Sequence, residues 1–112
     1  MDLTPEQAAL TPCAIILDQL GRRALFMLGA KDLMAIEDRK GLRFKVGRNA
    51  KGVNRVDIVL ADDDTYTITF SSVRKQRGSY VHDVKVLAQE TMVYADSMHR
   101  TIETHTGMYT SL

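Results

Sequence analysis

The sequence predicts an α+β fold in which N- and C-terminal helices pack on one face of an antiparallel β-sheet. Three observations predict it: helical spacing of apolar residues near both ends, alternation of apolar and polar residues between them, and turn-forming residues that separate the alternating segments. These segments indicate a hairpin meander of five or six strands. The chain of 112 residues fits a single domain, residues 1–112, that can bury a core without disulfides.

The first helix is predicted over residues 11–20. Thr11 is a suitable N-cap, Pro12 occupies the first helical position, and Gly21 follows the last turn. Residues 1–10 contain a weaker helix start, so this segment is either a short helix or a flexible N-terminal arm. The apolar face of the first helix comprises Cys13, Ile16, Leu17 and Leu20.

Residues 24–28 form a continuous apolar run, which fits either a buried strand or an extension of the first helix. Two hairpins and one further strand are expected after it, with alternate residues facing the core, including Val84 and Val86. The expected strands are residues 33–37 paired with 42–46, residues 53–60 paired with 65–73, and residues 80–89.

A second helix is predicted over residues 91–106, because apolar residues recur there at helical spacing. Gly107 is a suitable residue just after the end of this helix. The apolar stripe comprises Met92, Ala95, Met98 and Ile102. The two helices should cover the apolar face of the sheet, and the polar face should meet water.

Positive charge is concentrated in the middle of the chain. Residues 39–55 contain seven Lys or Arg residues and no Asp or Glu, although the net charge of the chain is only +1. Such a cluster attracts the phosphate backbone of nucleic acids. The candidate nucleic-acid-binding residues are Arg39, Lys40, Arg43, Lys45, Arg48, Asn49, Lys51, Arg55, Arg74, Lys75 and Arg77.

The same charges are compatible with two further roles. Exposed strand positions carry Lys and Arg that keep a sheet from aggregating, and an acidic protein partner would also be attracted. Stacking of bases is not favoured, because Phe44, Tyr66 and Phe70 are expected to face the core.

The sequence contains no catalytic constellation, so neither enzymatic activity nor a cofactor is expected. The three histidines lack the spacing of a zinc site, and the aspartates at 62–64 lack the pattern of a calcium loop, so no metal is expected. Cys13 should be packed on the helix. Without a signal peptide or an apolar segment long enough to span a bilayer, the sequence predicts a soluble cytoplasmic protein with no membrane partner.

Several short segments are distinctive as a set: Gly29-Ala30-Lys31, Phe44, Arg48-Asn49-Ala50-Lys51-Gly52 with Asn54, Asp64-Thr65-Tyr66, Tyr94-Ala95-Asp96, and Thr106-Gly107 with Tyr109 and Leu112. In this order, over most of residues 11–112, the chain resembles a set of small, mostly uncharacterised proteins of bacteriophages and prophages. The resemblance implies an accessory protein of a virus or mobile element in the cytoplasm of a bacterial host. It implies no particular activity and no catalytic residues.

Two functional hypotheses follow. The first is a small non-enzymatic binding module that contacts DNA or RNA phosphates through a basic sheet face and the loop at residues 47–52. The alternative is a protein-binding or assembly protein without a nucleic-acid role, which either inhibits a host factor or forms a homodimer.

Overall fold

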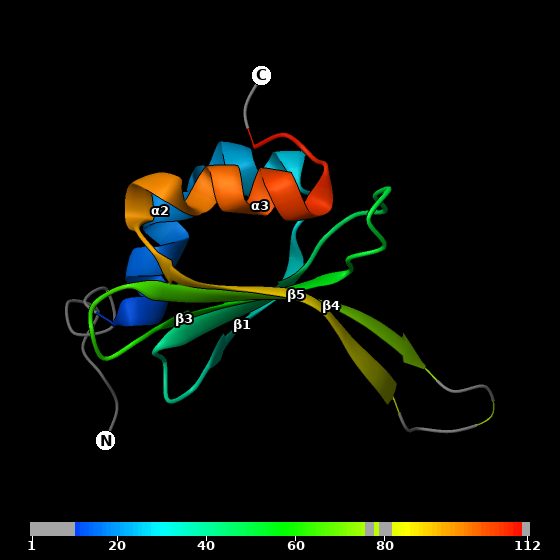
Figure 1. The fold of residues 1–112 in the computed structure, drawn as a ribbon, viewed down its shortest axis with the longest axis horizontal. Coiled ribbons are helices and arrows are strands. Elements are labelled where there is room, and N and C mark those ends of the chain that lie inside the picture. Colours follow the sequence, from blue (N-terminus) through cyan, green and yellow to red (C-terminus); the bar gives the residue numbers. More distant parts are fainter. Residues whose placement is uncertain (1–10, 76–77, 79–81, 111–112) are drawn as a thin grey trace.

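The computed structural model describes residues 11–75, 78 and 82–110, which form a five-stranded antiparallel sheet and two α-helices (Figure 1). Each strand pairs with the next one along the chain, in the order β1-β2-β3-β4-β5. The predicted α+β class and antiparallel meander are therefore confirmed. The elements are α2 (Pro12–Met27), β1 (Lys31–Ile36), β2 (Gly41–Lys45), β3 (Arg55–Leu60), β4 (Tyr66–Lys75), β5 (His82–Val93), the 3₁₀ helix η1 (Ala95–Ser97) and α3 (Met98–Thr106).

Helix α2 starts as the sequence predicts and is interrupted where the sequence predicts its end. The Thr11 hydroxyl accepts a hydrogen bond from the Ala14 N–H at 3.3 Å, which caps the first turn. Gly21 has φ 80° and ψ 158°, a backbone conformation that leaves the helical path and suits glycine. Helical backbone resumes after it and ends at Met27, so the apolar run at 24–28 extends the helix rather than forming a strand.

The buried stripe of α2 is narrower than predicted. Ile16, Leu20 and Ala24 are buried at a spacing of four residues, whereas Leu17 is exposed. The expectation that Leu17 belongs to the core face is therefore wrong. The helix contacts the sheet along one narrow line, which leaves the neighbouring position in solvent.

The central strands show the alternation that the sequence predicts. In β2, β3 and β4, Phe44 lies opposite Val56, and Val56 lies opposite Phe70. These side chains and those of Ile58 and Ile68 are fully buried. Because side chains alternate along a strand, the residues between them face the opposite side of the sheet.

Strand β5 departs from the prediction at its first half. Val84 and Val86 were expected to face the core, but both are exposed. The register with β4 shifts by one residue between Phe70, which pairs with Ala88, and Ser71, which pairs with Val86. This β-bulge at Leu87 reverses which alternate residues of β5 face the helices. Val84 and Val86 therefore lie on the side of the sheet away from the helices, although Ala88 lies on the helix side. Residues 80 and 81 of the predicted strand lie outside the described residues.

The second helix begins later than predicted. Strand β5 continues to Val93, which pairs with Tyr66, and the α-helix starts only at Met98. Pairing with β4 overrides the helical spacing of residues 91–93, and residues 95–97 form the 3₁₀ helix η1. Met92, predicted as a stripe residue, is exposed with φ 56°.

The end of the second helix agrees with the prediction. Met98 and Ile102 are fully buried. Gly107 has φ 71°, and its N–H donates a hydrogen bond to the Glu103 carbonyl at 2.9 Å, as expected of a residue just past a helix end.

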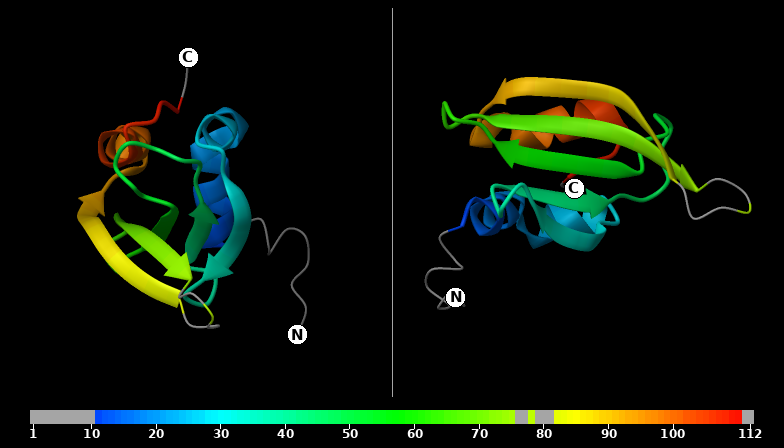
Figure 2. Two further views of the ribbon diagram at one scale, coloured as in Figure 1. Left: turned by 90° about the vertical axis from the view of Figure 1, so that its right-hand side faces the viewer. Right: turned by 90° about the horizontal axis from the view of Figure 1, so that it is seen from below.

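Both helices lie on the same side of a strongly curved sheet in Figures 1 and 2. Ile16 and Leu20 of α2, and Met98 and Ile102 of α3, belong to one hydrophobic cluster with the buried strand residues. The opposite side of the sheet carries no helix in these views, and we call it the open face. None of the described helices is long and apolar enough to cross a membrane.

Candidate functional site

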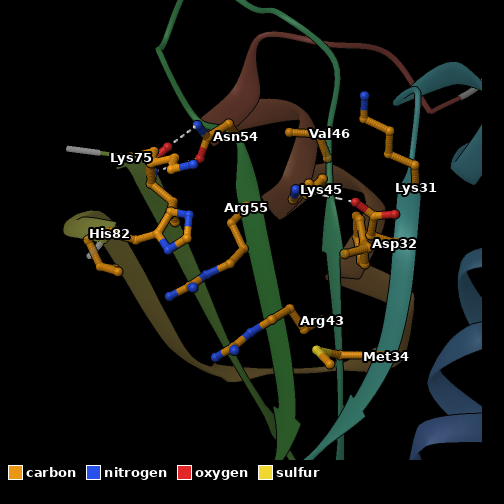
Figure 3. Close-up of a pocket in the computed structure, with 13 residues that line it drawn as sticks. Lys31, Asp32, Met34, Arg43, Lys45, Val46, Asn54, Arg55, Lys75 and His82 are labelled. Atoms are coloured by element: carbon orange, nitrogen blue, oxygen red, sulfur yellow. Dashed lines mark hydrogen bonds and ion pairs between the residues drawn. The ribbon is translucent and has the colours of Figure 1, made fainter. Parts of the chain in front are cut away.

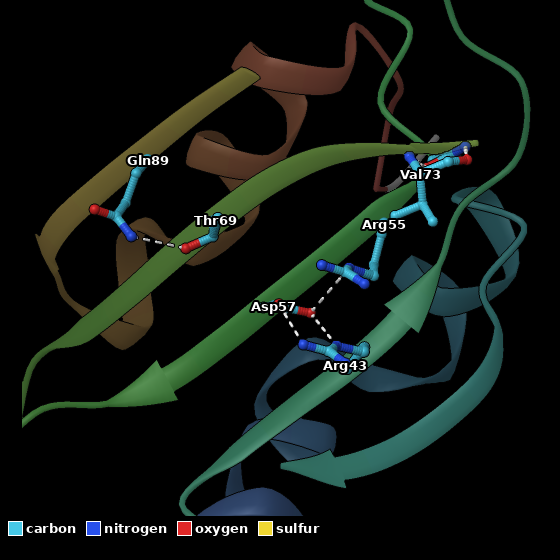
Figure 4. Close-up of polar contacts among 7 residues, drawn as sticks. Arg43, Arg55, Asp57, Thr69, Val73 and Gln89 are labelled. Atoms are coloured by element: carbon cyan, nitrogen blue, oxygen red, sulfur yellow. Dashed lines mark hydrogen bonds and ion pairs between the residues drawn. The ribbon is translucent and has the colours of Figure 1, made fainter. Parts of the chain in front are cut away.

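The open face of β2 and β3 holds two arginines around one aspartate. Arg43 lies opposite Asp57 in the register and binds it through two hydrogen bonds, from Nε to Oδ1 at 2.8 Å and from Nη2 to Oδ2 at 3.1 Å (Figure 4). Arg55 approaches the same carboxylate from the other side, with its Nε 3.9 Å from Oδ1. The side chain of Asp57 is only 14% exposed. One half-buried carboxylate therefore balances two guanidinium groups, and one positive charge remains.

The pairing with Asp57 also affects the pKa of the Arg43 guanidinium group. The hydrogen bond that Arg43 donates to Asp57 raises the pKa of Arg43, partly opposed by desolvation of the guanidinium. Like any arginine, Arg43 is a cation at neutral pH, and Asp57 fixes the position of that charge on the open face.

Two buried polar atoms, one in this cluster and one beside it, make no hydrogen bond. They are Nε of Arg55 and Oγ of Ser71, and their residues lie directly opposite each other in β3 and β4. An unpaired buried polar atom is costly, so these two atoms lower the stability of the strand pair.

A groove of about 710 Å³ opens beside Arg55, and we call it the open-face groove. Its wall is apolar in part, with Met34, Val73 and Val84 among the lining residues. The Asn54 side chain ties β3 to β4 at the groove by a hydrogen bond to the Val73 carbonyl at 2.8 Å and one from the Val73 N–H at 2.7 Å.

The charge lining the open-face groove is mainly positive. Figure 3 shows basic side chains reaching it from β1, β2, β3 and β4. One carboxylate, Asp32, also lines the groove, where it lies 3.3 Å from the Lys45 Nζ. The five cationic lining residues are Lys31, Arg43, Lys45, Arg55 and Lys75.

The structure brings together only part of the predicted basic set. Arg43, Lys45, Arg55 and Lys75 line the open-face groove. Arg39 and Lys40 lie in the turn after β1, at the end of the first hairpin away from Lys31 and Lys45. The Arg39 carbonyl accepts a hydrogen bond from the Cys13 N–H at 2.9 Å, which places this turn beside the start of α2.

The remaining predicted residues lie in other surroundings. Lys51 and Arg74 line a second hollow, together with Asp83, Lys85 and Leu87. Arg48 is exposed in the loop between β2 and β3. Arg77 lies outside the described residues.

Asn49 has a structural role in the loop at residues 47–52. Its amide donates hydrogen bonds to the Gly47 carbonyl at 2.9 Å and to the Val53 carbonyl at 2.6 Å. Its side-chain oxygen accepts one from the Val53 N–H at 3.2 Å. These bonds close the loop on itself.

Sequence reasoning missed four polar residues of the groove: Lys31, Asp32, Asn54 and His82. His82 lies opposite Lys75 in the pairing of β4 with β5, so a correct register for that hairpin would have placed it beside a predicted site residue. Lys31 lies opposite Lys45, but its strand was predicted to start two residues later.

Other titratable groups do not gather into a site. The His99 ring lies 2.9 Å from the Leu20 carbonyl, and the His105 ring lies 3.0 Å from a Glu90 carboxylate oxygen. Within residues 11–75, 78 and 82–110, no three His, Cys, Asp or Glu side chains are placed to hold a metal ion. Burial raises the pKa of the Cys13 thiol, with a smaller opposing effect of Arg39.

Comparison with known proteins adds no assignment: no protein-family model matches the chain, and neither curated proteins nor solved structures give a significant match.

Proposed function

We propose that the protein is a non-enzymatic nucleic-acid-binding module that holds phosphates in the open-face groove. The observation that supports this most is the convergence of five cationic side chains from four strands on one groove. A phosphate oxygen is a strong acceptor for guanidinium and ammonium groups.

The charge of the groove favours a polyanion over a neutral ligand. Asp32 and Asp57 offset only part of the five positive charges. The two arginines sit on paired strands and are held by Asp57, so their positions are preorganised. The three lysines are more exposed than the two arginines and end in flexible ammonium groups, which suits contacts to a flexible phosphate backbone.

The groove favours contact with the backbone rather than with base faces. Among the described residues, Phe44 and His82 are the aromatic residues that line it. Phe44 is fully buried towards the helices, so the exposed His82 is the one described lining ring that a base could contact. The apolar patch of Met34, Val73 and Val84 offers contact without ring stacking. We therefore expect weak discrimination among sequences and strong dependence on salt.

The first experiment is fluorescence anisotropy with labelled single-stranded DNA, duplex DNA and single-stranded RNA over a series of salt concentrations. If about four groove cations contact phosphates, the logarithm of the binding constant falls with log salt at a slope of about −3.6 for duplex DNA and about −2.8 for a single strand. No binding to any of the three at low salt overturns the proposal.

A matched pair of variants tests the location. Lys31→Gln with Lys45→Gln removes two charges from the groove, whereas Arg39→Gln with Lys40→Gln removes two charges from the other end of the same hairpin. The groove variant should bind more than about tenfold more weakly at low salt, with a salt slope shallower by about 1.4–1.8. An equal loss in both variants would mean that net charge, not the groove, drives binding.

The contribution of the loop at residues 47–52 is tested separately. Arg48→Gln with Lys51→Gln removes its two charges without touching the hydrogen bonds of Asn49. A weaker affinity and a shallower salt slope would add the loop to the phosphate site. Unchanged binding would restrict the site to the groove.

The proposed setting is the cytoplasm of a bacterial host. It rests on the resemblance to phage and prophage proteins, for which DNA or RNA is an abundant polyanionic partner.

A further inference from the structure

Strand β5 is a long edge of the sheet. It has 12 residues, and within the described part of the chain its strand partner is β4 alone. It contains no proline, and 10 of its 12 residues are exposed. An edge of this length presents a row of backbone donors and acceptors that can pair with another strand.

The opposite edge, β1, is built differently. It has six residues, its register with β2 is irregular between Lys31 and Met34, and Asp32 has φ 54°. Short length and a bulge are features that discourage pairing at an edge. Strand β5 also has bulges, at the two shifts of its register with β4, but it is twice as long as β1 and offers the longer row of backbone groups to a further strand.

Two exposed side chains at alternate positions in the first half of β5 are apolar. Val84 is 50% exposed and Val86 is 58% exposed, and both lie on the open face. Isolated exposed apolar residues are normal, but two at alternate positions of one edge strand form a strip that a neighbouring strand would cover.

The bulge at Leu87 determines which residues share a face. Beyond it, Glu90 pairs with Ile68 and so lies on the helix side of the sheet, where its carboxylate meets His105 of α3. Before it, Lys85 pairs with Ser72, which is also on the helix side. Lys85 and Glu90 are five positions apart, so in a regular strand they would lie on opposite faces of the sheet. The bulge between them places both on the same face.

We propose that two copies of this chain pair through antiparallel β5 strands, with a two-fold axis between Leu87 and Ala88. In this register Lys85 of one copy lies opposite Glu90 of the partner subunit. The two-fold symmetry repeats the contact, so each dimer has two such ion pairs. Val86 then lies opposite Gln89 of the partner subunit, again on matching faces of the sheet.

Charge complementarity is the argument for a second copy as the occupant. A lysine on an edge strand ordinarily prevents pairing. In this register each Lys85 instead meets a carboxylate, so the edge is complementary to itself. A strand from an unrelated protein would have to supply a carboxylate and a cation at the same spacing, together with the same bulge.

The dimer has a consequence for the open face. A two-fold axis between antiparallel strands of one sheet runs perpendicular to the sheet, so it leaves both open faces on the same side. The two grooves of a dimer would therefore face one ligand. The pairing itself does not depend on what the grooves bind.

The first test measures mass in solution by sedimentation over a wide range of protein concentration. The unmodified chain should form a dimer. Lys85→Glu or Glu90→Lys alone should raise the dissociation constant by more than about tenfold, because each places two like-charged pairs in the interface. The double variant carrying both changes should restore the dimer. A monomer at every concentration overturns the proposal, as does a dimer whose affinity the charge changes do not alter.

A second test does not depend on Glu90, whose change also removes the contact with His105. In a Cys13→Ser background, Val86→Cys with Gln89→Cys should give a covalent dimer on mild oxidation, because paired Cα atoms about 4.5–5.5 Å apart suit a disulfide. Within one chain the two positions are roughly 9 Å apart, too far to bridge. The control is His82→Cys with Gln89→Cys, which the register does not juxtapose. Equal cross-linking of both variants, or none of either, overturns the register.

Discussion

The two faces of β2, β3 and β4 carry alternate residues of the same strands and have different physical roles. Towards the helices, Phe44, Val56 and Phe70 are fully buried and pack against one another. On the open face, Arg43, Asp57 and Arg55 form a charged cluster that is still partly exposed. Burial of apolar area stabilises a fold far more than partly solvated ion pairs do, so stability should depend mainly on the first face, and the proposed binding on the second.

The largest loss of stability is expected from a substitution on the buried face. Phe44→Ala should lower the free energy of unfolding by about 3–5 kcal/mol, because it removes a fully buried ring and leaves a cavity. Chemical denaturation of the variant and of the unmodified protein measures the difference. The matched control is the next residue: Lys45→Ala removes an exposed ion pair with Asp32 and should change stability by less than about 0.5 kcal/mol. Similar effects of the two changes would contradict the comparison.

A smaller loss of stability is expected from adding a side chain where β2 and β3 approach closely. In Gly41→Ala the added Cβ would lie 2.7 Å from the Ile58 carbonyl oxygen and 2.9 Å from Val59 Cγ2, so the backbone must shift. We expect a loss of about 1–3 kcal/mol in thermal or chemical unfolding. Gly47→Ala is the control, because its Cβ would make an ordinary contact of 3.6 Å with the Leu28 carbonyl. A stable Gly41→Ala protein would mean that the hairpin accommodates the side chain.

The open face should respond in opposite directions in stability and binding. Asp57→Asn removes the carboxylate between two guanidinium groups, so stability should fall by about 1–2 kcal/mol, less than for a fully buried pair because Arg43 is partly solvated. The same change leaves more positive charge in the open-face groove, so affinity for nucleic acid at low salt should rise. Denaturation and anisotropy on one preparation measure both. Weaker binding by a folded variant would show that Asp57 is needed to position the arginines.

The smallest effect concerns the exposed turn between β3 and β4. Asp63 accepts hydrogen bonds from the hydroxyl and the N–H of Thr65, and the hydroxyl bond is the main cause that lowers the pKa of this carboxyl. A lowered pKa in the folded state means that the carboxylate stabilises the fold above the ordinary aspartate pKa, and that this contribution is lost as the pH falls through the folded-state pKa. The stability difference between the unmodified protein and Asp63→Asn should therefore be present at neutral pH and vanish in acid. A difference independent of pH would contradict this cause.

Local signals in the sequence were sufficient for the start of α2 and for the central hairpins. Thr11 and Gly21 mark a cap and a break through their own chemistry, whatever the rest of the chain does. Strict alternation around Phe44 and Ile58 assigned the buried face correctly, because a one-residue slip would expose every apolar side chain.

The candidate site was only half predictable. The alternation that buries Phe44 also places Arg43 and Lys45 on the opposite face, so their exposure followed from the sequence. Three of their neighbours in the groove could not be predicted in this way. Lys31, Asp32 and His82 reach the groove only through the pairing registers of β1 and β5. Grouping all basic residues by sequence also joined Arg39 to a site from which the first hairpin separates it.

The sequence by itself determined the α+β class, the antiparallel meander and the buried face of the central strands, because each depends on periodicity and turn chemistry within a few residues. Tertiary structure alone decided the bulge at Leu87, the extension of β5 to Val93 and the membership of the groove. These features depend on hydrogen bonds and contacts with strands distant in the chain. Such pairings override local preference, and no short segment of the sequence encodes them.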